Sequence, residues 1–318
     1  MGMTGPSANW RLGFTLSLTT AALWGVLPIA LKVVLEGMDA YTIVWWRFAA
    51  AMAGLGAFLA WRGALPRIRG AGRAGLVLLA VATATLIGNF VLYLVALDHA
   101  TPSVTQVVIQ LAPLLLLAGG VLVFREHFAR AQWVGFAVLA AGLLLFFNDR
   151  LPELARPGEG IGLGVALTVA AAVSWALYGL AQKQLLRHFT AQQVLWIIYV
   201  GATVLMLPAA DPYAVAELNG LQLGMFAFCC LNTLAAYGAF VESLYFWDVS
   251  RVSAVLATAP LFTIGAMWII ERAGLGIVAA EGLNALSVAG ALMVVGGSMA
   301  CALVRGAKGD ANLFRNDD

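Results

Sequence analysis

The stretch ALDHATPSVTQVVIQLAPLL at residues 96–115 returns 147 residues later as SLYFWDVSRVSAVLATAPLF at residues 243–262. At this single offset Pro113 falls on Pro260. The rest of the chain repeats at nearby offsets, which change only between apolar segments, as expected when loops absorb insertions and deletions. The chain is therefore an internal duplication.

Each half of the chain holds five apolar segments, which is an odd number. The second copy must then cross a membrane in the direction opposite to the first, which is the inverted-repeat architecture of many secondary transporters. The sequence therefore predicts an all-α membrane protein of ten transmembrane helices in two inverted five-helix repeats. Further repeat mates are Trp24 and Trp175, Lys32 and Lys183, Trp45 and Trp196, Gly135 and Gly290, and Gly142 and Gly297.

Composition places the chain in a bilayer without reference to the repeat. Apolar residues make up 62% of the chain and charged residues 11%, and the mean hydropathy is +0.90, so no soluble fold could bury this much apolar surface. Most apolar runs are near the roughly 20 residues needed to cross ~30 Å of hydrocarbon, and their continuity favours helices over a β-barrel. The short run at 132–147 is expected to extend into its flanks. The runs cover residues 13–35, 41–61, 74–97, 101–123, 132–147, 161–182, 192–210, 220–245, 253–270 and 284–303.

The two predicted repeats cover residues 13–147 and 161–303 and together form one transmembrane domain. Connecting loops, a short head and a polar tail are all that lie outside the apolar runs. We therefore expect no soluble catalytic domain.

Arginine and lysine residues lie mainly on one side of the predicted membrane. With both termini in the cytoplasm, thirteen of them fall inside and three or four outside, which favours this orientation by the positive-inside rule. The first apolar run lacks a strong basic segment before it and a clear small-residue cleavage site after it, so we expect a retained span. The sequence thus predicts a multi-pass membrane protein with both termini in the cytoplasm.

Motifs for catalysis or metal binding do not stand out in the sequence. HExxH, GxSxG, P-loop and CxxC patterns are absent, and the three histidines lie in or near loops. Cys229 and Cys230 are adjacent and Cys301 lies apart, which suits apolar packing better than a disulfide or a metal site. We therefore expect a protein that is not an enzyme, with no cofactor and no metal.

Three features carry a family resemblance: the W-x3-P-x3-K pattern of Trp24, Pro28 and Lys32, the stretch quoted above, and the pair Arg125 and Glu126. By these features the chain resembles the drug/metabolite transporter superfamily, EamA type. The resemblance covers almost the whole chain. It implies a basket of ten helices around a central cavity that works by alternating access. Within the superfamily the chain is similar to bacterial inner-membrane exporters of aromatic and other amino acids.

Polar and aromatic side chains near the middle of the predicted helices mark the candidate binding site. Inverted-repeat transporters bind cargo near the bilayer midplane, and depth follows from ~1.5 Å of rise per residue. Carboxamides cannot face lipid tails without losing hydrogen bonds, so they should face protein or water. The predicted substrate-binding residues of the central cavity are Trp24, Asn89, Tyr93, Gln106, Gln110, Trp175, Tyr178, Asn232, Tyr237 and Thr258.

The amides in this set have two interpretations. Gln106 and Gln110 are four residues apart and share one helix face, as do Asn89 and Tyr93. The amides either line the cavity or only bridge neighbouring helices, and the cavity role is favoured for Gln110 and Asn89. Aromatic faces suit an apolar side chain, while carboxamides and free carbonyls suit an ammonium and a carboxylate. Neutral amino acids are therefore the expected substrates.

The second repeat departs from the first at several polar positions. The cavity is therefore expected to be asymmetric, and matching the copies by symmetry alone is unsafe. The replacements are Arg47 by Ile198, Gln110 by Ala257 and Asn89 by Ala236.

Pro28, Pro113 and Pro260 each leave a helix carbonyl without its usual partner and allow a kink. Pro113 and Pro260 are repeat mates, as gates at opposite faces would require. We therefore predict hinge or gating roles, with a merely structural kink as the alternative. The glycine pairs of the fifth and tenth helices, seven residues apart, indicate close helix packing.

Two charged residues lie inside apolar runs. Arg47 is about two turns from the outer surface, where a lone charge costs several kcal/mol unless it is paired or reaches the headgroups. Snorkelling towards Asp39 or the headgroups is the favoured interpretation, and capture of a substrate carboxylate is the alternative. Glu242 lies about one turn from the inner end of its helix, where a local pair with Arg251 or Lys183 is expected.

The leading hypothesis is a secondary transporter that exports aromatic and other neutral amino acids by alternating access. A multidrug or nucleobase efflux carrier of the same superfamily is the alternative, and a channel or an integral-membrane enzyme is disfavoured. Expected partners are a small-molecule substrate and the lipid bilayer, with no nucleic acid and with the monomer as the functional unit. Because Glu242 is the only carboxylate within an apolar run, facilitated export is favoured over obligatory proton antiport.

Overall fold

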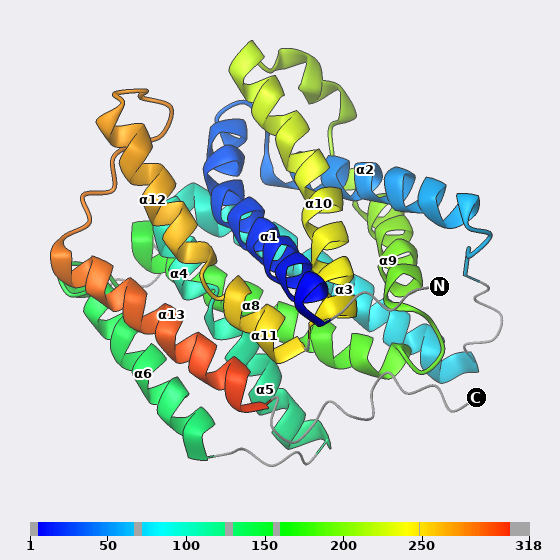
Figure 1. Ribbon diagram of the computed structural model, residues 1–318. Helices are drawn as coiled ribbons and strands as arrows, with labels where there is room; N and C mark the ends of the chain where they lie inside the picture. Colours follow the sequence, from blue (N-terminus) through cyan, green and yellow to red (C-terminus); the bar gives the residue numbers. More distant parts are fainter. Residues whose placement is uncertain (1–5, 67–71, 125–129, 155–159, 248, 306–318) are drawn as a thin grey trace. The chain divides into compact units, whose positions relative to one another are not determined.

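Helices make up the secondary structure of the residues that the computed structural model describes, which are 6–66, 72–124, 130–154, 160–247 and 249–305 (Figure 1). The helices of the first half are α1 (Pro6–Leu35), α2 (Ala40–Trp61), α3 (Gly72–His99), α4 (Pro102–Val108), α5 (Leu111–Phe124), α6 (Arg130–Phe146) and α7 (Leu151–Leu154). Those of the second half are α8 (Gly160–Leu185), α9 (Ala191–Met206), the 3-10 turns η2 (Leu207–Ala209) and η3 (Pro212–Glu217), α10 (Gly220–Phe246), α11 (Val249–Leu256), α12 (Ala259–Arg272) and α13 (Ala285–Arg305).

The predicted apolar runs coincide with these helices. Within the described ranges, nine helical segments are long and apolar enough to cross a membrane, with α4–α5 and α11–α12 counted as one segment each. The run at 132–147 corresponds to α6, a shorter apolar helix of 17 residues. That helix stops at Phe146 and does not extend past the C-terminal end of the run, while the residues just before Arg130 lie outside the described ranges.

Loop side chains determine where several helices begin. Asp39 accepts hydrogen bonds from two backbone N–H groups at the start of α2. Thr190 and Gln193 form a reciprocal capping box at the start of α9. Thr101 caps α4, where Pro102 takes an early position that needs no hydrogen bond from its nitrogen. These caps satisfy backbone groups that would otherwise lack partners at the helix ends.

Two of the predicted spans are broken helices. Residues 109–110 separate α4 from α5, and residues 257–258 separate α11 from α12, so the breaks are repeat mates to within one residue. At both breaks a backbone N–H bonds to the carbonyl three residues earlier instead of four. Pro113 and Pro260 follow the breaks and lack the N–H that would continue the helical ladder across them. By contrast, Pro28 lies inside the continuous helix α1.

The helices form two compact units, and each unit draws on both halves of the sequence. Helix α1 passes from unit 1 to unit 2 at Pro28, and α10 passes from unit 2 to unit 1 after Leu234. Unit 1 contains Met1–Leu27, Glu126–Pro152 and Ala235–Asp318, and unit 2 contains Pro28–Arg125 and Glu153–Leu234.

In unit 2, α2 and α9 pack antiparallel through a reciprocal pair of hydrogen bonds. The indole Nε1 of Trp45 donates to the carbonyl of Thr203 at 2.9 Å, and that of Trp196 donates to the carbonyl of Met52 at 3.1 Å. Trp45 and Trp196 are repeat mates at offset 151, and so are Met52 and Thr203. The same contact is therefore made twice, once in each direction, as in an isologous interface.

In unit 1, α6 and α13 lie side by side and pack in the same reciprocal way (Figure 1). A Cβ atom on Gly135 would lie 2.9 Å from the carbonyl oxygen of Gly297, and one on Gly297 would lie 2.6 Å from that of Gly135. Gly142 and Gly290 oppose each other in the same manner, at 2.8 and 2.6 Å. Side chains at these positions would separate the two backbones, so the close packing predicted from the glycine spacing is confirmed.

Candidate functional site

The predicted binding residues fall into two groups, one in each compact unit. Unit 2 holds the larger group, which is polar, and unit 1 holds a smaller, aromatic group. The residues in unit 2 are Asn89, Tyr93, Gln106, Gln110, Trp175, Tyr178 and Asn232, and those in unit 1 are Trp24, Tyr237 and Thr258.

A polar pair joins α3 to α4 in unit 2. The hydroxyl of Tyr93 donates to Oε1 of Gln106 at 2.8 Å. All seven residues of α4 are buried, Gln106 among them, and Gln110 is buried at the break that follows. Buried amides and phenols need hydrogen-bond partners in the protein or in a bound molecule. This short helix therefore brings three of the predicted binding residues into one buried, polar stretch that ends at a helix break.

Asn89 connects two helices of unit 2. Its Nδ2 atom donates to the backbone carbonyl of Ala171 in α8 at 2.9 Å. The NH2 group of this amide thus bridges two helices. This role is the alternative to the cavity role that the sequence favours for Asn89. A cavity role for the same side chain stays a prediction.

The other predicted residues of unit 2 lie on α8 and α10. Tyr178 and Asn232 are buried, and Trp175 is half-buried. Tyr178 follows Trp175 by three residues, so both side chains leave neighbouring positions of the same helix face. The amphipathic side chains expected from the sequence are therefore largely enclosed in this unit.

Arg47 is a buried cation of unit 2, with 5% of its surface exposed. Its Nε atom donates to Oγ1 of Thr233 in α10 at 3.2 Å, and its guanidinium carbon lies 4.6 Å from the centre of the Phe90 ring in α3. Asp39 instead caps α2 through Oδ1. The expected snorkelling towards Asp39 is therefore wrong, because contacts with α3 and α10 hold the side chain inside the unit.

Phe90 and Thr233 have no sequence signal that marks them as functional. Each lies one residue after a predicted binding residue, Asn89 on α3 and Asn232 on α10. A buried arginine requires acceptors for its N–H groups, but residue spacing does not say which helix supplies them. Because Arg47, Phe90 and Thr233 lie on three helices, their association depends on the fold.

In unit 1, Trp24 and Tyr237 form an aromatic pair between α1 and α10. Their ring centres are 5.5 Å apart with an interplanar angle of 66°, and Phe240 places a third ring 5.9 Å from Trp24. This edge-to-face geometry is one that aromatic rings prefer. Thr258 lies at the break before α12, where its hydroxyl donates to the carbonyl of Val255 at 2.6 Å. The hydroxyl of Thr258 is therefore used locally.

The remaining candidates are the prolines and Glu242. Pro28 and Pro260 are buried, whereas Pro113 is exposed, and the hinge role of all three stays a prediction. Glu242 is exposed on α10. The local pair expected between Glu242 and Arg251 or Lys183 stays a prediction.

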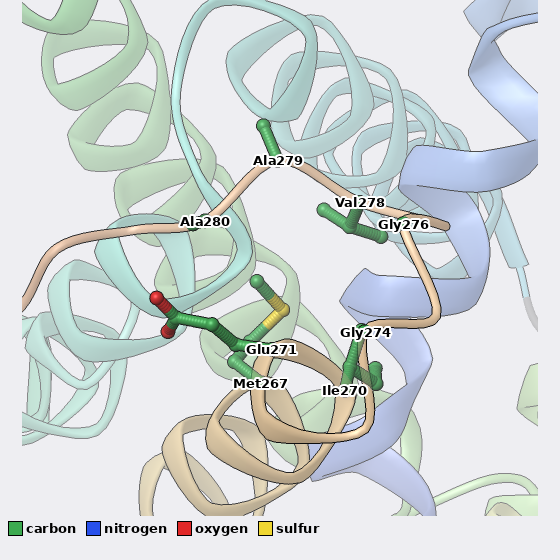
Figure 2. A pocket seen from close by; sticks show the side chains of 8 residues that line it. All are labelled: Met267, Ile270, Glu271, Gly274, Gly276, Val278, Ala279 and Ala280. Atoms are coloured by element: carbon green, nitrogen blue, oxygen red, sulfur yellow. The ribbon is translucent and has the colours of Figure 1, made fainter.

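A pocket of about 530 Å³ lies away from all of these residues, at the end of α12 and along the segment that follows it. Figure 2 shows Met267, Ile270 and Glu271 projecting from the last turns of α12, with Val278 on the facing segment. Glu271 is the one charged side chain among the residues that line this pocket. A single carboxylate among apolar groups offers little for the recognition of a specific solute, so the polar stretch of unit 2 is the stronger candidate site.

Within the described ranges, His, Cys, Asp and Glu side chains do not gather in groups of three or more that could hold a metal ion.

The chain matches the model of the EamA-like transporter family twice, over residues 11–148 and again over residues 162–296. An "Uncharacterized transporter" of Haemophilus influenzae is 42% identical over 292 residues, which are 92% of this chain and 95% of that protein. The "Uncharacterized inner membrane transporter YhbE" of Escherichia coli strain K12 is 41% identical over 293 residues, covering 92% of this chain and 91% of that protein.

More distant similarities extend over most of the chain as well. A "Probable amino-acid metabolite efflux pump" of Salmonella typhimurium is 23% identical over 296 residues, covering 89% of this chain and 92% of that protein. A crystal structure superposes with a TM-score of 0.59 at 17% identity over 92% of this chain and 96% of that chain, which is a likeness of fold alone.

Proposed function

Because the chain belongs to the EamA-like transporter family, we propose that this multi-pass membrane transporter exports small metabolites, with aromatic and other neutral amino acids as its main cargo. The observation that carries the proposal is the buried polar stretch of unit 2, where Tyr93 bonds to Gln106 next to Gln110 and the helix break. Polar groups inside apolar helices are costly, and they typically line the path of a polar solute. The name of the distant Salmonella relative supports amino-acid metabolites as the class of cargo.

The architecture that we propose is a pair of inverted five-helix repeats. The reciprocal tryptophan contacts of α2 and α9 in unit 2 support it, and so do the reciprocal glycine contacts of α6 and α13 in unit 1. Each pair consists of repeat mates that run antiparallel, which requires a local two-fold relation perpendicular to the helices. For helices that cross a membrane, such a relation inverts one copy with respect to the other.

The proposed location is the bacterial inner membrane, with both termini in the cytoplasm. The excess of arginine and lysine on one side of the predicted topology supports this orientation. The name of the Escherichia coli relative, an inner membrane transporter, supports the location.

In the proposed cycle, alternating access opens the solute site first to one face of the membrane and then to the other. The helix breaks before Pro113 and Pro260 support a gating role, because a broken helix can bend without losing a continuous hydrogen-bond ladder. Pro28 supports a hinge, since α1 leaves one compact unit and enters the other at this residue. With Glu242 exposed on α10, net export is driven by the solute gradient, in preference to proton antiport.

A carrier for flat solutes such as nucleobases or drugs is the second candidate. The aromatic pair of Trp24 and Tyr237, extended by Phe240, is the observation that favours it, because aromatic faces and edges pack well against planar molecules.

Counterflow in proteoliposomes of the purified protein tests the function and separates these candidates. Vesicles preloaded with unlabelled phenylalanine or leucine should accumulate the labelled amino acid transiently and with saturation. Accumulation of labelled adenine or ethidium, without any amino acid, would support the second candidate. Flux that does not saturate would indicate a channel. Trp133→Ala changes an exposed residue of α6 and should transport like the wild type, so it serves as the control for variants of the candidate site.

Cysteine labelling tests the inversion. In a background without the three native cysteines, single cysteines at Glu36 and Tyr213 should react with an impermeant maleimide in intact cells. Those at Leu65 and His188 should not. Glu36 and His188 lie in equivalent loops of the two halves, so labelling of both from outside would contradict the inverted repeat.

A further inference from the structure

Arg47 lies at a depth where an arginine needs a negatively charged partner. It is the eighth residue of α2, about 10 Å along the helix from its start at ~1.5 Å per residue. The side chain is buried. A charge inside a transmembrane helix is costly unless it is paired, and such residues typically mark the path of a substrate or an ion.

The described residues supply no carboxylate for Arg47. Its contacts are the hydrogen bond from Nε to Thr233 and the stack of the guanidinium on Phe90, and both partners are neutral. Asp39, the acid nearest to it along α2, caps that helix. The positive charge is therefore held in place, and within the described part of the chain it is not neutralised.

The two terminal nitrogens of Arg47 carry four N–H donors, and no described residue accepts a hydrogen bond from them. The indole nitrogen of the neighbouring Trp46 is fully enclosed without a partner, and neither terminal nitrogen of Arg47 is among the enclosed, unpartnered atoms of the described residues. Phe90 covers one face of the guanidinium, and the bond to Thr233 engages Nε. The edge formed by the two terminal nitrogens remains available, and this edge can bind a carboxylate through two parallel hydrogen bonds.

We propose that Arg47 is the receptor for the carboxylate group of the transported solute. The inference rests on the proposed carrier function and narrows its cargo to monocarboxylates, amino acids included. One guanidinium balances one negative charge, and its repeat mate Ile198 is apolar, so the second copy adds no cation at the equivalent position. A dianion such as a phosphate ester would keep an uncompensated charge.

Aromatic rings next to Arg47 define the kind of carboxylate. Phe48 lies 4.7 Å from Phe90 and 5.8 Å from Tyr199, measured between ring centres. Tyr93 is also close enough to Arg47 for an electrostatic interaction, so the Tyr93–Gln106 pair belongs to the same part of unit 2. A carboxylate with an apolar or aromatic body matches these surroundings.

Ligand-induced thermal stabilisation of the purified protein tests the receptor without any variant. The probes are phenylacetate and isovalerate, each compared with its neutral amide of the same shape, and phenyl phosphate as a dianion. We expect each carboxylate to raise the unfolding temperature with a half-saturating concentration at least tenfold below that of its amide. Equal stabilisation by acid and amide would overturn the proposal, and so would stronger stabilisation by phenyl phosphate.

Variants then assign the effect to Arg47. Arg47→Gln should abolish the preference for acid over amide, and Arg47→Lys should keep a reduced preference because an ammonium lacks the planar fork. The matched control is Arg62→Gln, since Arg62 directly follows the last residue of the same helix and stacks on Phe58 at 4.7 Å but is exposed. An unchanged preference in Arg47→Gln, or an equal loss in Arg62→Gln, would contradict the assignment.

Thr233 and Phe90 act as positioning residues for the guanidinium. Variants at these two positions test the proposal even if Arg47→Gln does not fold. Thr233→Val and Phe90→Leu retain the charge and remove one contact of the guanidinium each. We expect both variants to weaken carboxylate binding about threefold and to leave amide binding unchanged. Equal weakening for acid and amide would point to a structural role and would overturn the proposal.

Counterflow separates failure of this inference from failure of the carrier function. If the wild type exchanges amino acids and Arg47→Gln does so at the same rate, the carrier function stands and the receptor fails. If no solute is exchanged but acid binding still depends on Arg47, the receptor stands and the carrier function fails.

Discussion

The two helix breaks are copies of each other in backbone but not in side chains. The α4–α5 break follows Gln106 and contains Gln110, both of which are buried. The repeat mates of these two glutamines are Ser253 and Ala257 at the α11–α12 break. Both copies retain a proline and a turn with three-residue hydrogen bonds. The helix break with its proline is therefore present in both copies, whereas the two glutamine side chains are present only in the first copy.

Packing next to the breaks differs as well. In unit 1, α12 approaches α1 so closely that Oγ1 of Thr263 donates to the carbonyl of Gly25 at 2.6 Å. In unit 2, α5 meets α8 through leucine side chains, with Leu116 against Gly179. Backbone contact tolerates almost no change, whereas a leucine can rotate. The α4–α5 break is thus the more polar, and the α11–α12 break is the more tightly packed.

The largest expected effect is the loss of this tight packing. In Gly25→Ala, the added Cβ atom would lie 2.6 Å from the carbonyl oxygen of Ala259 and 2.5 Å from the Cβ of Phe262. We expect a cost of about 2–3 kcal/mol, or roughly 5–10 °C in the unfolding temperature in detergent. The control is Gly179→Ala, which meets only the flexible side chain of Leu116, with its nearest terminal carbon at 2.8 Å, and should lose much less. An equal loss in both variants would remove the distinction between the two breaks.

The next effect concerns the amide chemistry. Gln110→Ala should lower amino-acid counterflow about tenfold with normal membrane expression, because about 1.4 kcal/mol of binding free energy corresponds to a factor of ten. Ser253→Ala, which truncates a polar side chain at the other break, should change the rate less than twofold. Wild-type counterflow by Gln110→Ala for every accepted solute would place the site elsewhere.

A smaller effect is expected when one hydrogen bond is removed. Tyr93→Phe loses the bond to Gln106 and should slow counterflow about fivefold, in line with a net value of about 1 kcal/mol. Thr258→Val is the corresponding change at the second break, where the hydroxyl bonds only to its own helix turn, and it should have little effect. If Thr258→Val were the more harmful of the two, the polar function would belong to the second break.

The smallest effect should come from the prolines. Pro260→Ala restores an N–H group and should allow a more continuous helix, which we expect to slow counterflow about threefold if the break works as a gate. Pro113→Ala changes an exposed residue and should slow it less. Unchanged rates in both variants would mean that the breaks are only structural kinks.

Several features of this protein could be predicted from residue type and spacing alone. The apolar runs coincide with helices because length and hydropathy decide whether a segment can cross a bilayer. The glycine stripes of α6 and α13 face each other because only glycine allows such close contact between backbones. The missing N–H of proline predicts a kink at Pro28, Pro113 and Pro260, and the helix is broken before the last two.

Other features depended on which helices become neighbours. The partner of Arg47 is Thr233, 186 positions away in the chain, and the amide of Asn89 meets a carbonyl 82 positions away. Nearness in sequence favoured Asp39 as the partner of Arg47, but Asp39 caps α2 and Arg47 bonds to Thr233. Local spacing therefore misplaced this charge.

By itself, the sequence determined that this protein is a duplicated, membrane-embedded bundle of helices with kinks allowed at matching prolines. These are properties of single segments, set by hydropathy, residue size and the missing proton of proline. The tertiary structure alone decided which polar groups meet, including the setting of Arg47 between Phe90 and Thr233. Those contacts join helices far apart in the chain, and no periodicity within one helix contains the identity of its neighbour.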